Sequence, residues 1–280
     1  MNQIKTVALL GLLSGLLVAS GYALGGQAGA TIGLGIAVLT NFGSWYFSDR
    51  IALSAYGAQP VTPEQAPDLY AMLQRLCERA NLPMPGLYIV PTDSPNAFAT
   101  GRDPEHAAVA VTEGILRLLP ADELEGVIAH ELSHVRNRDT LTQAVAATIA
   151  GAISWVAQLA MFIPLGRNDE DGPNPLVALA TIIVAPIAAS VVQFAISRTR
   201  EFSADAGAAR LTGNPRALAR ALQRLEQTAH QAPIEGNPAF APLLIINAFS
   251  RRSALTNLFA THPATEARIE RLLKLEQKLG

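Results

Sequence analysis

The feature that most constrains this chain is a stretch near its N-terminus without any charged residue between Lys5 and Asp49. A helix needs roughly 20 apolar residues to cross a bilayer, so the stretch is too long for one span and suits two. The sequence Gly25-Gly26-Gln27 offers a natural break between them. We therefore predict a hairpin of two transmembrane helices, near 6–25 and 28–47.

Two further charge-free runs follow residue 140, separated by a short acidic turn at 167–171. They predict a second hairpin, with transmembrane helices near 142–163 and 175–197. The composition agrees, because charged residues make up only 16% of the chain, against roughly 25% in soluble domains. Two alternatives stay open at this point. The apolar segments could be buried helices of a soluble protein, and residues 1–25 could be a cleaved signal peptide.

The positive residues near the ends of the predicted spans indicate the orientation, since such residues favour the cytoplasmic side. All but Arg167 fall on one side, and they are Lys5, Arg50, Arg136, Arg138, Arg198 and Arg200. The prediction is a multi-pass protein of the cytoplasmic (inner) membrane. It divides the chain into a first hairpin (1–49), a cytoplasmic part (50–139), a second hairpin (140–197) and a second cytoplasmic part (198–280).

The two cytoplasmic parts have the patterns of a mainly α domain with a small β-sheet. Thr62 and Pro63 resemble a helix start, and apolar residues continue at helical spacing to about residue 79. Apolar stretches predict strands at 87–90, 96–100 and 107–111. Further helices are expected from Thr112, from about Pro120, and near 199–211, 215–230 and 263–279.

The sequence His130-Glu131-Leu132-Ser133-His134 lies in the helix expected from Pro120. Residues four apart project from the same face of a helix, so His130 and His134 could bind one zinc ion. Glu131 could then act on the water bound to that metal. The alternative is an exposed helix with solvated histidine and glutamate side chains.

A catalytic zinc ion needs a third protein ligand and an open position for water. The best candidate is Glu201, because the predicted second hairpin returns the chain to the side on which His134 lies. Asp205 follows one turn later and could accept a hydrogen bond from a ligand histidine. The alternative for these two acids is ion pairing with nearby arginines. His106 and His230 are interpreted as surface residues.

Four segments in this order carry a resemblance to a known family. They are Asn96-Ala97-Phe98-Ala99-Thr100-Gly101, His130 to His134, Arg200-Glu201-Phe202-Ser203-Ala204-Asp205 and Thr261-His262-Pro263. The chain resembles the HtpX heat-shock membrane zinc metalloproteases, relatives of the eukaryotic CAAX prenyl endoprotease Ste24, with a gluzincin-like site. One departure is Ala264-Thr265, where relatives usually continue with a second proline.

The resemblance implies one zinc ion per chain, held by His130, His134 and Glu201, with Glu131 as general base and Asp205 behind the ligands. It implies attack of zinc-bound water on the peptide bonds of misfolded or damaged membrane proteins, in protein quality control and the stress response. It also makes His262 a candidate for stabilising the oxyanion, supported by Asn96 and Arg268 as substrate-binding residues. The local pattern allows His262 to be a helix cap instead. Strands at 96–100 and 107–111 could offer an edge to a substrate.

Other function classes fit less well. The net charge of −2 gives no reason to expect nucleic acid binding, and the expected partners are protein substrates and the lipid bilayer. Cys77 is the only cysteine, so no internal disulfide is expected. The main alternative is a catalytically silent membrane chaperone or scaffold with structural zinc, although structural zinc usually has four protein ligands. A prenyl-protein endoprotease would need a larger chamber than four spans can enclose.

Overall fold

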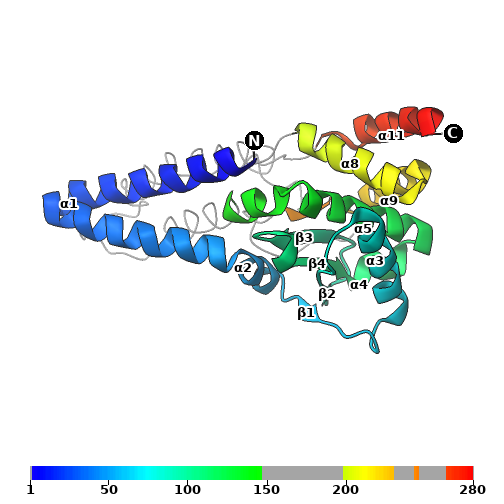
Figure 1. Ribbon diagram of the computed structural model, residues 1–280, viewed down its shortest axis with the longest axis horizontal. Coiled ribbons are helices and arrows are strands. Elements are labelled where there is room, and N and C mark those ends of the chain that lie inside the picture. The colour runs from blue at the N-terminus through cyan, green and yellow to red at the C-terminus, as the bar shows by residue number, and fades with distance from the viewer. Residues whose placement is uncertain (1, 147–197, 230–242, 246–262, 280) are drawn as a thin grey trace, which may run out of the picture.

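A computed structural model describes residues 2–146, 198–229, 243–245 and 263–279. Helices dominate, and a single small sheet of four strands is present in these residues (Figure 1). The helices are α1 (Asn2–Tyr46), α2 (Ser48–Ala55), α3 (Pro67–Ala80), α4 (Glu113–Leu118), α5 (Ala121–Arg136), α8 (Arg198–Thr212), α9 (Pro215–Ala229) and α11 (Thr265–Leu279), with a 3₁₀ turn at Pro104–His106. The strands are β1 (Gln59–Pro60), β2 (Gly86–Val90), β3 (Ala97–Gly101) and β4 (Ala107–Thr112).

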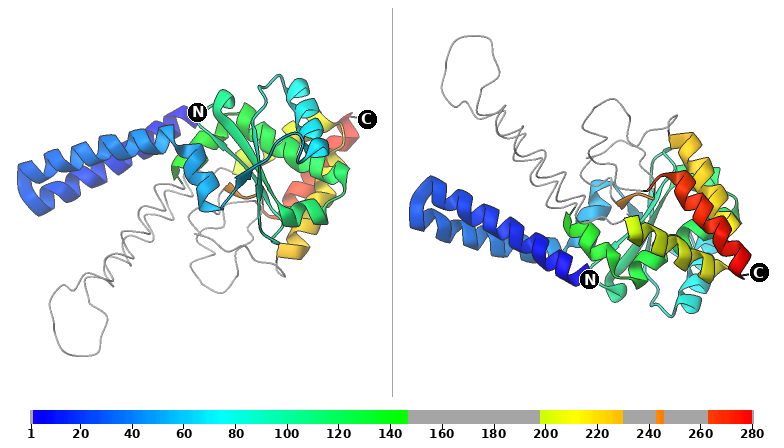
Figure 2. Two further views of the ribbon diagram at one scale, coloured as in Figure 1. Left: turned by 90° about the horizontal axis from the view of Figure 1, so that it is seen from below. Right: turned by 90° about the horizontal axis from the view of Figure 1, so that it is seen from above.

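Helix α1 consists of two arms that lie side by side and extend away from the rest of the protein (Figures 1 and 2). The chain reverses at Gly25 and Gly26, where φ is +57° at Gly26, a conformation that glycine adopts without strain. A hydrogen bond of 2.8 Å from Asn41 Nδ2 to Ser14 Oγ joins the arms. The chain therefore forms a helical hairpin with a break at the predicted glycines, and the membrane-spanning nature of its helices stays a prediction.

Within the described part of the chain, no helix is long and apolar enough to cross a membrane. The second predicted hairpin, with helices near 142–163 and 175–197, lies almost wholly outside the described residues. After α5 the chain is helical again over 139–146, as far as it is described there.

The sheet is mixed, with the strand order β1-β2-β4-β3. Strand β4 pairs in parallel with β2 and antiparallel with β3, so it lies inside the sheet. The expectation that 107–111 could offer an edge to a substrate is therefore wrong, because both sides of β4 are already paired. Among the strands that the structure describes, only β3 remains as an edge strand near the predicted zinc site.

Helix α3 begins at Pro67. The sequence pattern instead predicts a start near Thr62. Thr62 and Gln65 do form the expected capping contact, in which Thr62 N donates to Gln65 Oε1 at 2.8 Å. However, the residue before a proline avoids helical backbone angles, and Ala66 before Pro67 has φ −140° and ψ 64°. The first turn is thus separated from the helix.

Helix α5 forms the centre of the domain. It packs against β3 and β4 on one side and is covered by α8 and α9 on the other (Figures 1 and 2). The helices approach closely because of two glycines. A Cβ at Gly126 would lie 3.0 Å from the backbone nitrogen of Leu218 in α9, and a Cβ at Gly207 in α8 would overlap Ser133 Oγ. This close packing places the first turn of α8 beside the histidines of α5.

Candidate metal centre

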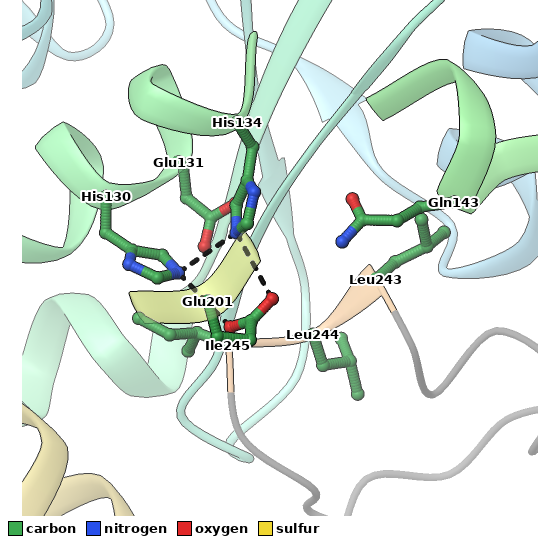
Figure 3. A pocket seen from close by; sticks show the side chains of 8 residues that line it. All are labelled: His130, Glu131, His134, Gln143, Glu201, Leu243, Leu244 and Ile245. Atoms are coloured by element: carbon green, nitrogen blue, oxygen red, sulfur yellow. Dashed lines mark hydrogen bonds and ion pairs between the residues drawn. The ribbon is translucent and has the colours of Figure 1, made fainter. Parts of the chain in front are cut away.

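The three predicted zinc ligands meet in the interior of the domain (Figure 3). His130 and His134 project from one face of α5, and their Nε2 atoms are 3.1 Å apart. Glu201, in the first turn of α8, faces both rings, with its carboxylate oxygens 3.6 Å from His130 Nε2 and 3.5 Å from His134 Nε2. All three side chains are buried.

Each histidine is held by a carboxylate at its other ring nitrogen. His130 Nδ1 lies 3.0 Å from Asp205 Oδ1, and His134 Nδ1 lies 3.0 Å from Asp139 Oδ2. A hydrogen on each Nδ1 satisfies these carboxylates and leaves a lone pair on each Nε2. The two Nε2 lone pairs then point toward one another and toward the Glu201 carboxylate.

Two facing lone pairs repel unless a cation lies between them, so this arrangement fits a metal ion. Two nitrogens bound to one tetrahedral zinc ion are about 3.3 Å apart, given Zn–N bonds of about 2.05 Å, and the observed separation is 3.1 Å. Burial alone would lower the pKa of His130, but hydrogen bonds to Asp205 and Glu201 raise it to about 9. The pocket therefore favours positive charge, which a proton on His130 supplies when the metal is absent, and two imidazoles with one carboxylate suit zinc.

Asp139 is a site residue that the sequence reasoning missed. It is 1% exposed and starts the helical segment 139–146, after a turn in which Arg138 adopts φ +58°. The pattern of metal-ligand spacing contains no rule for this position. One signal was available, because a ligand histidine usually needs an acceptor for its second nitrogen and Asp139 follows His134 by five residues.

Arg268, which the sequence suggested as a substrate-binding residue, lies fully buried behind His130. Its Nε and Nη2 donate to the two carboxylate oxygens of Asp205 at 2.9 and 2.7 Å. Burial opposes ionisation of Asp205, but the charge of Arg268 and hydrogen bonds from Arg268 and His130 lower the pKa of Asp205 to about 2. Arg268 thus keeps Asp205 charged, and Asp205 orients the ring of His130.

Glu131 lies on α5 beside the two histidines and contacts the edge of the sheet. Its Oε2 accepts a hydrogen bond of 2.9 Å from the backbone N–H of Ala99 in β3. Burial raises the pKa of Glu131 above its ordinary value, although the neighbouring histidines oppose the shift. A buried carboxylate with a raised pKa, beside a metal site, has the properties of a general base.

The remaining predicted residues are distributed as follows. Asn96 is buried just before β3, and its Oδ1 accepts hydrogen bonds of 3.0 Å from the backbone N–H groups of Ala97 and Ile245. His106 is exposed and lies 2.6 Å from Asp103, as expected of a surface residue. The oxyanion candidate His262 and the predicted surface residue His230 lie outside the described residues.

The sequence also gave no indication of the pocket that surrounds the site. Its lining includes Glu131, the three predicted ligands and four residues not singled out before, namely Gln143, Leu243, Leu244 and Ile245 (Figure 3). A hydrophobic segment far along the chain has no pattern that would place it beside the zinc motif.

The fold and this constellation of residues agree with comparisons to known proteins. The chain belongs to peptidase family M48, whose family model matches residues 63–276. It is 65% identical to a protein named Protease HtpX homolog from Trichormus variabilis, over 99% of this chain and 98% of that protein. It is 50% identical to a protein of the same name from Thermococcus kodakarensis, over 99% of this chain and 97% of that one.

The crystal structure of S. mikatae Ste24p is similar in fold, with a TM-score of 0.51 and 16% sequence identity. The match covers 96% of this chain but only 65% of that longer one. The resemblance to HtpX proteases is thus confirmed. The protein is a metalloprotease that hydrolyses peptide bonds, and zinc is the metal of its family. The alternative of a catalytically silent scaffold is accordingly set aside.

Proposed function

We propose that this protein is a membrane-bound zinc endopeptidase that cleaves misfolded or damaged membrane proteins at the cytoplasmic face, in protein quality control and the stress response. His130, His134 and Glu201 hold the zinc ion, and Glu131 is the general base. The observation that carries the mechanism is the position of Glu131. It is buried beside the ligands, and the backbone of β3 fixes its carboxylate.

Bound zinc supplies a Lewis acid that polarises the peptide carbonyl and makes water more acidic. Glu131 takes a proton from the attacking water and later delivers it to the leaving amine. Burial raises the pKa of Glu131, which makes its carboxylate a better proton acceptor than an exposed glutamate. Asp205 and Asp139 keep the histidine rings oriented. By the family resemblance, His262 stabilises the oxyanion, and Asn96 and Arg268 support substrate binding.

The membrane placement is supported by the surface of the α1 hairpin. Large apolar side chains are exposed along both arms, including Val7 (69%), Ile32 (64%) and Leu39 (74%). A helix that is apolar all round requires an apolar environment, and lipid provides one. The segments near 142–163 and 175–197 complete the proposed four spans, with 50–139 and 198–280 on the cytoplasmic side.

The proposed role of Glu131 is tested with Glu131→Gln in the purified full-length protein, assayed on an unfolded model substrate. We expect kcat to fall by roughly a hundred- to ten-thousand-fold, which is the usual contribution of a general base. Zinc content should stay at one ion per chain, because Glu131 is not a ligand. The matched control is Glu125→Gln on the same helix, which should retain activity. Full activity of Glu131→Gln would refute the mechanism.

A further inference from the structure

A short segment of the chain itself occupies the space in front of the zinc ligands. Leu243, Leu244 and Ile245, which we call the Leu243–Ile245 bend, are at most 4% exposed and line the pocket that holds the ligands (Figure 3). The pocket leaves essentially no space for even a water-sized sphere. Sites that take up organic ligands usually measure at least roughly 300 Å³. A peptide therefore has no room while the bend is in place.

Both polar backbone groups of Ile245, its N–H and its C=O, are hydrogen-bonded. Its N–H lies 3.1 Å from the carbonyl oxygen of Ala97 and 3.0 Å from Asn96 Oδ1, and donates to both. Its carbonyl accepts a hydrogen bond of 3.1 Å from Arg268 Nη1. Asn96 and Arg268 are the two residues that the sequence suggested for binding substrate. In this structure they bind a residue of the same chain, next to Glu131.

The edge of β3 is also occupied by internal contacts. Thr112 N donates to the carbonyl of Asn96, so Asn96 faces β4 and the odd-numbered residues of β3 face away from it. On that outer side, Ala97 accepts from Ile245, Ala99 donates to Glu131, and Gly101 accepts from the Thr140 hydroxyl. Peptides commonly bind proteins by pairing with such an edge, and here the chain itself has taken these groups.

We propose that Ile245 is an internal ligand of the substrate groove, which occupies the place of a substrate residue and must move away before a peptide binds. The inference rests on the proposed function. The substrate class follows from Ile245 itself, which is an aliphatic residue with its N–H and C=O both bound. The groove should accept a peptide with an aliphatic residue at this place.

The first test compares Ile245→Ala with wild type in cleavage of a short peptide that contains leucine and isoleucine. Truncation removes apolar contact that favours the occupied groove, so kcat/KM should rise by roughly tenfold. The matched control is Ile89→Ala in β2, another isoleucine packed on the core but outside the pocket, which should leave kcat/KM unchanged. An unchanged or lower kcat/KM for Ile245→Ala would mean that the bend is a fixed wall, and would overturn the proposal.

The second test measures binding without turnover. A fluorescently labelled form of the same peptide is titrated against Glu131→Gln and against the double variant Glu131→Gln/Ile245→Ala, with fluorescence anisotropy as the readout. The double variant should bind about tenfold more tightly, and a peptide with aspartate in place of its aliphatic residues should bind neither protein. Equal affinity of the two proteins for the aliphatic peptide would contradict the proposal.

The two tests separate this inference from the proposed function. If the wild type cleaves no faster than Glu131→Gln but the double variant binds more tightly, the catalytic assignment fails and the internal ligand stands. If the wild type cleaves the peptide but substitution of residue 245 changes neither kcat/KM nor peptide affinity, only the internal-ligand proposal is refuted. Should Ile245→Ala fail to fold, Ile245→Val gives a smaller rise in kcat/KM in the same direction, and its absence counts against the proposal.

Discussion

At the scale of single residues, the centre depends on acids that do not face the pocket. Asp205 and Asp139 each hold the outer nitrogen of one proposed ligand histidine at 3.0 Å. Arg268 in turn keeps Asp205 ionised. The spacing of His130 and His134 was predictable because a helix repeats every 3.6 residues. Asp139 was not, because its position depends on the turn at Arg138, and no local motif indicates that turn.

Replacement of Asp139 by asparagine tests the role of this acid. An asparagine oxygen can still accept from His134 Nδ1, but the negative charge that strengthens the imidazole as a ligand is lost. Zinc affinity should therefore fall by about 10- to 100-fold, measured by competition with a chelator. Asp103→Asn, which changes the acid beside the exposed His106, should have no effect. Glu201→Ala removes a proposed ligand and sets the level expected for loss of the metal. Wild-type affinity in Asp139→Asn would exclude a role in metal binding.

At the scale of elements, the position of Glu201 depends on how closely α8 approaches α5. Sequence patterns predicted both helices. They did not predict how closely the helices cross, which depends on the contact between Gly207 and Ser133. They likewise placed a strand at 107–111 without revealing that β2 and β3 cover both of its sides. Pairing partners and helix crossings arise from contacts between distant segments, and local periodicity carries no information about them.

Gly207→Ala is the direct test of this crossing. Alanine would favour the helix by roughly 0.5–1 kcal/mol, whereas overpacking usually costs about 1–3 kcal/mol. The cost should be larger here because the added Cβ would also lie 2.9 Å from Ser133 Cβ, which cannot rotate away. We expect a lower midpoint of thermal unfolding and weaker zinc binding, since Glu201 moves with α8. In a Ser133→Ala background the same change should cost less, and equal costs in both backgrounds would contradict the packing argument.

At the scale of the whole molecule, the hairpin and the metal centre meet at the same strand. Helix α2 follows the hairpin directly and packs on β3, where Tyr56 and Phe98 have ring centroids 5.2 Å apart. Arg102, just after β3, donates to the carbonyl of Tyr46 at the end of α1. Strand β3, whose Ala99 N–H donates a hydrogen bond to the Glu131 carboxylate, is therefore fixed to the base of the hairpin. If the hairpin lies in the bilayer, the zinc ion lies close to the cytoplasmic membrane face.

The membrane placement can be tested by labelling with a thiol reagent that does not cross membranes. Cys77 is the only cysteine, so Cys77→Ala provides a background without thiols. In that background Gln27→Cys marks the tip of the hairpin and Glu64→Cys marks the domain, and both positions are exposed. We expect Glu64→Cys to be labelled only in inverted membrane vesicles and Gln27→Cys only from the outside of intact spheroplasts. Labelling of both positions from the same side would show that the hairpin does not cross the membrane.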